Sequence, residues 1–81
     1  MEYKVLLRQR IKVYGIEFHV ELRQYPDADG AGWYQLMNVY DSCEDVCGIP
    51  YRTLKEAAAA FEGAVGRRLS CGMKQYLGLE E

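Results

Sequence analysis

Few residues in this chain of 81 have the chemistry of a catalytic site. It contains one histidine, His19, and three cysteines, Cys43, Cys47 and Cys71. A nucleophilic site needs a cysteine or serine, a base, and a group that orients the base. Neither a Gly-x-Ser-x-Gly stretch nor a Cys–His signature is present in the sequence. The sequence therefore predicts a protein that is not an enzyme.

The same residues are a poor match to a metal site. Cys43 and Cys47 are separated by three residues, and only Cys71 and His19 could complete a ligand set. Structural zinc sites usually have four ligands in paired short spacings, and the acidic stretches do not have the spacing of a calcium loop. We expect no metal and no cofactor. An odd number of cysteines without an export signal indicates reduced thiols and a cytoplasmic location.

The composition is that of one small globular domain spanning residues 1–81. Hydrophobic residues make up 49% of the chain and charged residues 27%, with a net charge of −2 and a pI near 5.4. These values give no general sign of binding to nucleic acid or to an anionic membrane. The first residues alternate instead of forming a long apolar run, so we expect neither a signal peptide nor a membrane span.

Two alternating segments predict a hairpin that would position most of the charged side chains. Residues 4–13 alternate with period two, and residues 16 to about 25 do so after a Tyr14-Gly15 turn. The predicted core faces are Val5, Leu7, Ile11 and Val13 on the first strand, and Ile16, Phe18, Val20 and Leu22 on the second. The predicted outward faces are Lys4, Arg8, Arg10 and Lys12, and Glu17, His19, Glu21 and Arg23. Basic residues would then lie across from Glu17 and Glu21, a stabilising arrangement.

The central part of the chain predicts one or two further strands. Residues 26–32 form a loop by composition, and a third strand follows over residues 33–40. Its faces are ambiguous, and the preferred interpretation directs Asn38 and Tyr40 outward. Residues 41–48 are interpreted as an acidic turn. Residues 49–51 could add a short fourth strand, which Pro50 would restrict to an edge.

A helix is predicted over residues 53–71, followed by a tail over residues 72–81. Thr53 and Glu56 have the spacing of a capping box, and Gly72 is the expected C-cap. The predicted core stripe is Leu54, Ala58, Phe61, Val65 and Leu69. With the sheet over residues 3–52, the predicted fold is a two-layer α+β domain: a three- to four-stranded antiparallel sheet with one C-terminal helix on one face, in the order β-β-β-(β)-α.

The predicted helix has a second stripe opposite its core face, made of small residues. Ala59, Gly63, Gly66 and Ser70 fall together at about 100° per residue. Small side chains permit another backbone to approach closely, so we interpret this stripe, together with Tyr34 and Tyr40, as a protein interface. It could also join two copies in a homodimer, as could the long edge strand over residues 5–13.

The basic strand offers an alternative function in nucleic-acid binding. Lys4, Arg8, Arg10 and Lys12 would form a basic stripe that ends at Tyr14. The stretch Gly32-Trp33-Tyr34 through Tyr51-Arg52-Thr53-Leu54-Lys55-Glu56-Ala57 resembles the last strand and helix entry of the arm-binding domains of tyrosine recombinases. That resemblance implies a sheet inserted into the major groove of DNA. Glu17, Glu21 and the two acidic loops would oppose phosphate contacts.

In size and plan the chain is similar to small phage and mobile-element proteins, anti-CRISPR inhibitors among them. That similarity implies a steric inhibitor or an accessory factor and assigns no residue. Together with the missing catalytic constellation, it favours a non-enzymatic protein-binding module with a protein partner. Nucleic acid is the less favoured partner, and no membrane partner is expected.

Overall fold

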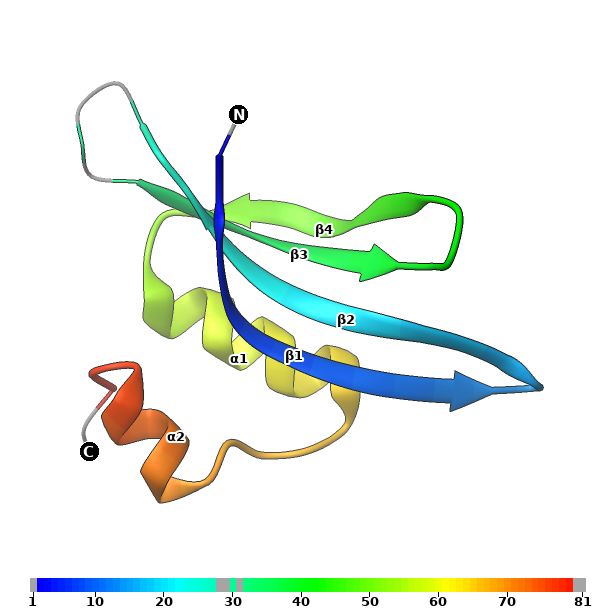
Figure 1. Ribbon diagram of the computed structural model, residues 1–81. Helices are drawn as coiled ribbons and strands as arrows, with labels where there is room; N and C mark the ends of the chain where they lie inside the picture. Colours follow the sequence, from blue (N-terminus) through cyan, green and yellow to red (C-terminus); the bar gives the residue numbers. More distant parts are fainter. Residues whose placement is uncertain (1, 28–29, 31, 80–81) are drawn as a thin grey trace.

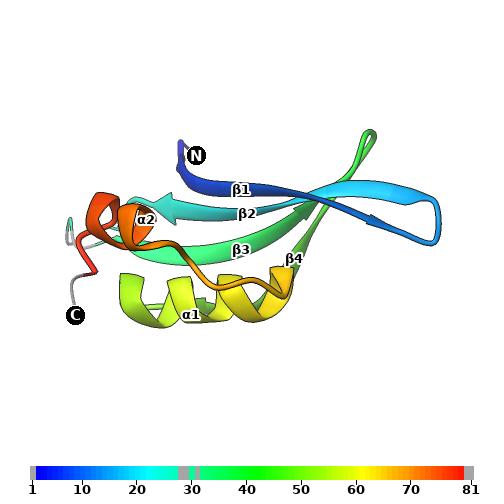
Figure 2. The same cartoon turned by 90° about the horizontal axis from the view of Figure 1, so that it is seen from below.

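A computed structural model describes residues 2–27, 30 and 32–79 of the chain, so the predicted loop over residues 26–32 lies partly outside it. Four antiparallel strands form one sheet in sequence order: β1 (Lys4–Val13), β2 (Ile16–Tyr25), β3 (Trp33–Val39) and β4 (Glu44–Tyr51). Helix α1 (Leu54–Val65) packs on one face of this sheet, and a short helix α2 (Cys71–Tyr76) follows (Figures 1 and 2). The predicted two-layer α+β fold is confirmed.

The core lies between α1 and the sheet. Helix α1 packs on β2, β3 and β4, and β1 forms one edge of the sheet. We call the side that carries α1 the helix face and the other side the open face. The core cluster consists of Leu7, Val20, Leu22, Leu36, Ala57 and Phe61. Burial of these side chains is the main favourable contribution to folding.

The β1–β2 hairpin has the predicted turn. Tyr14 and Gly15 both have positive φ, 52° and 80°, as a two-residue turn that matches the strand twist requires. The register places Lys12 opposite Glu17 and Arg8 opposite Glu21. The predicted opposition of basic and acidic residues is confirmed.

An irregularity in β1 overturns the predicted faces at its beginning. The register shifts between Val5 and Leu7, so that Val5 lies opposite Arg23 and Leu7 lies opposite Leu22. Residues that are directly opposite in an antiparallel pair point to the same side, and a bulge adds one residue to one strand. Val5 therefore belongs to the open face, and its predicted core position is wrong. The sequence does not reveal a bulge, because apolar residues stand on both sides of it.

The preferred faces of β3 are also wrong. Leu36 lies opposite Leu22 and belongs to the core on the helix face, together with Tyr34 and Asn38. The alternate set, which includes Gln35 and Met37, lies on the open face, yet these two side chains are buried. Both faces of β3 carry buried side chains, so alternation in the sequence could not distinguish them.

Strand β4 is longer than predicted. It begins at Glu44, within the stretch interpreted as an acidic turn, and its pairing with β3 is irregular between Tyr34 and Leu36. Gly48 has a φ of 82° in this region, which allows the strand to bulge. As predicted, the strand that contains Pro50 is at an edge of the sheet.

The predicted helix over residues 53–71 is divided into two. Thr53 caps α1 as predicted, because its side chain accepts a hydrogen bond from the Glu56 backbone N–H. The helix ends at Val65, where Gly66 adopts a left-handed φ of 71° and donates its backbone N–H to the carbonyl of Glu62. The side chain of Ser70 then caps α2, so Gly72 lies inside α2 and is not a C-cap. Part of the predicted tail is therefore helical.

Neither of the two described helices has the length and apolar character needed to cross a membrane.

Candidate functional site

A buried cation organises the open face. The side chain of Arg23 is only 2% exposed, although no helix covers this face in the described part of the chain. Its Nε donates to Glu21 Oε1 at 2.8 Å, and its Nη atoms donate to the two carboxylate oxygens of Glu44 at 3.1 and 2.9 Å. Nη1 also donates to the Tyr25 hydroxyl at 3.2 Å, and the ring of Tyr3 lies 4.0 Å from the guanidinium. Arg23 thereby joins β2, β4 and the N-terminal segment.

These contacts fix the charge of the network. The hydrogen bonds to Glu44 raise the pKa of Arg23 above its ordinary value, although burial opposes this change. The same bonds lower the pKa of Glu44. Arg23 remains protonated across the physiological range, so it holds strands together and does not transfer protons. The sequence analysis directed Glu21 and Arg23 away from the core, and both do lie on the open face. They are nevertheless buried there, because Arg23 contacts residues that are distant in sequence.

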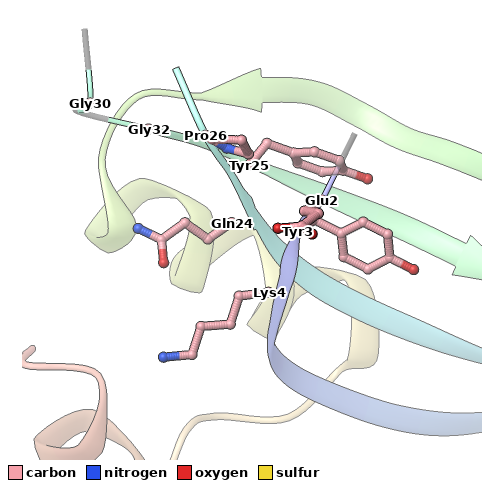
Figure 3. Close-up of a pocket in the computed structure, with 8 residues that line it drawn as sticks. All are labelled: Glu2, Tyr3, Lys4, Gln24, Tyr25, Pro26, Gly30 and Gly32. Atoms are coloured by element: carbon pink, nitrogen blue, oxygen red, sulfur yellow. The ribbon is translucent and has the colours of Figure 1, made fainter. Parts of the chain in front are cut away.

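Three aromatic rings continue this surface at one end of the sheet. The ring centroids of Tyr3 and Tyr25 are 5.3 Å apart, and Tyr25 stacks on Trp33 at 4.6 Å. A cavity of about 350 Å³ lies beside them at the ends of β1 and β2, with the rings of Tyr3 and Tyr25 on one side of the strands and Lys4 and Gln24 on the other (Figure 3). Tyr3 and Tyr25 contact Arg23, and Trp33 extends the row of rings to β3.

The predicted basic stripe is not continuous. Lys4 lies opposite Gln24 and therefore belongs to the helix face, whereas Arg8, Arg10 and Lys12 lie on the open face. The bulge in β1 causes this separation. Arg8 Nε is 3.4 Å from a carboxylate oxygen of Glu21, and Arg10 Nε is 2.9 Å from Glu17. Two of the four cations are thus balanced by carboxylates of β2. Tyr14 lies apart from them, at the tip of the hairpin.

The structure also separates the residues predicted as a protein interface. Ala59 and Gly63 are exposed on α1, whereas Gly66 ends that helix and Ser70 begins the next. The small-residue stripe is therefore wrong as a continuous helix surface. Its geometry depended on a helix that continues through Gly66.

The two tyrosines of that predicted interface contribute to the helix face instead of an open surface. Tyr34 packs against the core cluster and lies opposite Tyr51 in β4. Tyr40 stacks on Phe18 with ring centroids 5.1 Å apart. Both are only partly exposed.

The cysteines and the histidine are distributed over the molecule. Cys43 lies in the turn before β4, Cys47 lies in β4 and Cys71 lies in α2, and all three thiols are free. His19 lies on the open face opposite Arg10. Within residues 2–27, 30 and 32–79, no three potential ligands come together in a way that could hold a metal ion.

A surface that the sequence analysis missed is the free end of the β1–β2 hairpin. The hairpin extends past the end of α1 (Figures 1 and 2). At its tip Tyr14 is 99% exposed, Ile16 58% and Val13 45%. The register places Val13 opposite Ile16, and Ile11 opposite Phe18. These pairs continue the apolar helix face past the end of α1, which no longer covers it there. Val13 and Ile16, which the sequence analysis assigned to the core, therefore face solvent.

No protein-family model, curated protein or solved structure matches this chain.

Proposed function

We propose that this protein is a non-enzymatic, cytosolic protein-binding module whose principal contact surface is the free end of the β1–β2 hairpin. The observation that carries the proposal is the exposed apolar tip formed by Val13, Tyr14 and Ile16. Contiguous apolar surface on a small protein is typical of an interaction site. Tyrosine is enriched among the residues that dominate binding energy.

The rest of the molecule supports this use of the hairpin. The opposite end of the sheet is fixed by α1 on one face and by the Arg23 network on the other. A rigid base lowers the entropic cost of ordering a projecting element on binding. The small size and simple plan favour a steric inhibitor or accessory factor, as in the phage and mobile-element proteins that the chain is similar to in type.

The test is to isolate a stoichiometric complex from an extract of the source cell at physiological salt, and then to measure its affinity with variants. Tyr14 has a positive φ of 52°, a conformation that asparagine tolerates well. Tyr14→Asn therefore removes the ring without disturbing the turn. We expect this variant to bind the partner about 30-fold more weakly, as for a residue that dominates an interface.

Tyr76→Asn is the matched control, because Tyr76 is also highly exposed but lies on α2. This variant should retain the affinity of the native protein. Failure to recover any stoichiometric partner, or equal affinity of the two variants, would show that the hairpin tip is not the contact surface.

A further inference from the structure

A groove runs between the β1 edge and the segment that follows α1. It has a volume of about 220 Å³. Its apolar lining comes from Leu7 on β1, Phe61 and Val65 on α1, and Leu69 and Met73 after the helix. The groove exists because α1 packs on β2, β3 and β4, and the segment that follows α1 lies beside β1.

The far wall of this groove is held in place by specific contacts. The carboxylate of Glu62 accepts a hydrogen bond from the Leu69 backbone N–H. The Gly66 and Arg67 N–H groups both donate to the Glu62 carbonyl, and the Ser70 side chain caps α2. These hydrogen bonds hold the segment that follows α1 in place opposite β1.

The near wall is a strand edge with backbone groups that do not pair within the sheet. Among the described strands, β1 pairs with β2 alone. In an antiparallel ladder every second residue directs its N–H and C=O away from the partner strand. The carbonyl of Arg10 accepts a hydrogen bond from Gln9 Nε2 at 3.1 Å. This indicates that the backbone N–H and C=O groups of Arg10 point away from β2. By alternation, the backbones of Arg8 and Lys12 face the same free edge.

The charges around the groove are basic. Arg8, Arg67 and Arg68 line it, and no described carboxylate does. Arg67 and Arg68 are exposed and form no ion pair with any described residue. Arg8 is paired with Glu21 but remains more than half exposed. A second copy that paired its β1 with this one would place cation beside cation, which is unfavourable.

We propose that the groove binds an extended segment of a partner protein in which acidic and apolar residues alternate, added as a fifth strand to the β1 edge. This inference rests on the proposed protein-binding function and adds a partner of defined chemistry. Side chains of an added strand alternate between the two faces. The apolar set contacts the groove, Ile11 and Val13. The acidic set lies on the open face beside Lys12, which is exposed, and beside Arg8 and Arg10, which remain 55% and 70% exposed although each is paired with a carboxylate of β2. Strand addition of this kind is an established mode of peptide recognition.

The test measures binding of three labelled peptides of about ten residues by fluorescence anisotropy. The first alternates glutamate and valine, the second has the same composition in two blocks, and the third alternates lysine and valine. We expect the first to bind at least tenfold more tightly than the other two. Equal binding of the alternating and block peptides would overturn the proposal, as would tighter binding of the basic peptide.

Two substitutions at residue 10 distinguish the contribution of the backbone to peptide binding from that of the side chain. Arg10→Ala removes the cation and keeps the outward N–H, whereas Arg10→Pro also removes the N–H, which is tolerated at an edge. Arg10→Pro should lose at least tenfold more affinity than Arg10→Ala, with circular dichroism confirming that both are folded. Equal affinities of the two variants would exclude strand addition.

The double variant Arg67→Glu and Arg68→Glu reverses the charge of the far wall and leaves the β1–β2 ladder intact. It should weaken binding of the acidic alternating peptide most at low ionic strength, where attraction between charges that are not in direct contact is least screened, and unchanged binding would overturn the charge argument. This variant also provides a readout if Arg10→Pro does not fold.

If a cellular partner depends on Tyr14 while the acidic peptide does not bind, the groove inference fails and the proposed function stands. A dimer that the peptide does not dissociate in light scattering would assign the edge to a second copy and overturn the inference.

Discussion

At the scale of single residues, Arg23 is the most informative side chain. It is buried on a sheet face that neither described helix covers, and it makes hydrogen bonds to Glu21, Tyr25 and Glu44. A buried cation is tolerated only when its donors are satisfied. Gln35 and Met37 are buried on the same face, where they lie opposite Arg23 and Glu21 in the strand register. The open face therefore needs no second layer, and its surface is a specific polar arrangement.

The Arg23 network predicts a loss of stability in acid. Hydrogen bonds from Arg23 hold the pKa of Glu44 below its ordinary value of about 4.5. As the pH falls below that value, the unfolded chain binds a proton at Glu44 before the folded protein does. This stabilising contribution is thus fully present above pH 4.5 and is lost as the pH falls through the folded pKa.

The measurement is urea unfolding at several pH values between 6 and about 3, for the native protein and for Glu44→Gln. The native protein should lose more stability than the variant below pH 4.5, since the variant has no carboxylate at this position. Parallel curves for the two proteins would contradict the proposed contribution of Glu44.

At the scale of elements, the end of α1 decides what surface the C-terminal part presents. The helix ends at Val65 because Gly66 takes a left-handed conformation, which glycine adopts without the steric cost of a Cβ atom. Without that stop, Arg67 and Arg68 would extend a single long helix. With it, the chain returns beside β1 and forms the far wall of the groove.

Alanine substitutions at the two glycines test this description of α1. Gly63 lies within the helix and has open space where a Cβ would stand, so Gly63→Ala should stabilise the protein by about 1 kcal/mol. Gly66 also has open space but a φ of 71°, so Gly66→Ala should destabilise it by about 1 kcal/mol. The two free energies of unfolding, measured in urea, should change in opposite directions. Stabilisation by both substitutions would indicate a helix that continues through residue 66.

At the scale of the whole molecule, the distribution of charge argues against nucleic-acid binding. The net charge is −2, and Arg8 and Arg10 are balanced by Glu21 and Glu17. Affinity for nucleic acid depends largely on cations that neutralise phosphates. The local resemblance to recombinase arm-binding domains stays a hypothesis, and the bulge in β1 weakens it by directing Lys4 to the other face. Self-association also stays a prediction.

Titration of the protein with labelled duplex and single-stranded DNA checks this interpretation. We expect no binding at physiological salt and no effect of Arg8→Ala or Arg10→Ala on any residual binding at low salt. Binding that weakens steeply with salt and is reduced by both variants would reverse the preference between the two functions.

The sequence by itself determined the first hairpin and the start of the main helix. Alternation with period two and the Tyr14-Gly15 turn predicted the β1–β2 hairpin and its pairs of opposite charge. The Thr53 cap predicted the start of α1. These features depend on residues close together in the chain, so backbone preferences and side-chain periodicity suffice to predict them.

Only the tertiary structure decided which surfaces are covered. The bulge that moves Val5 to the open face, the burial of Arg23 and the exposure of Ile16 depend on contacts between distant segments. The same holds for the groove beside β1, since its walls come from opposite ends of the sequence. An apolar residue in an alternating strand is equally compatible with core and interface, because the pattern specifies a face and the packing of other elements determines whether that face meets protein or solvent.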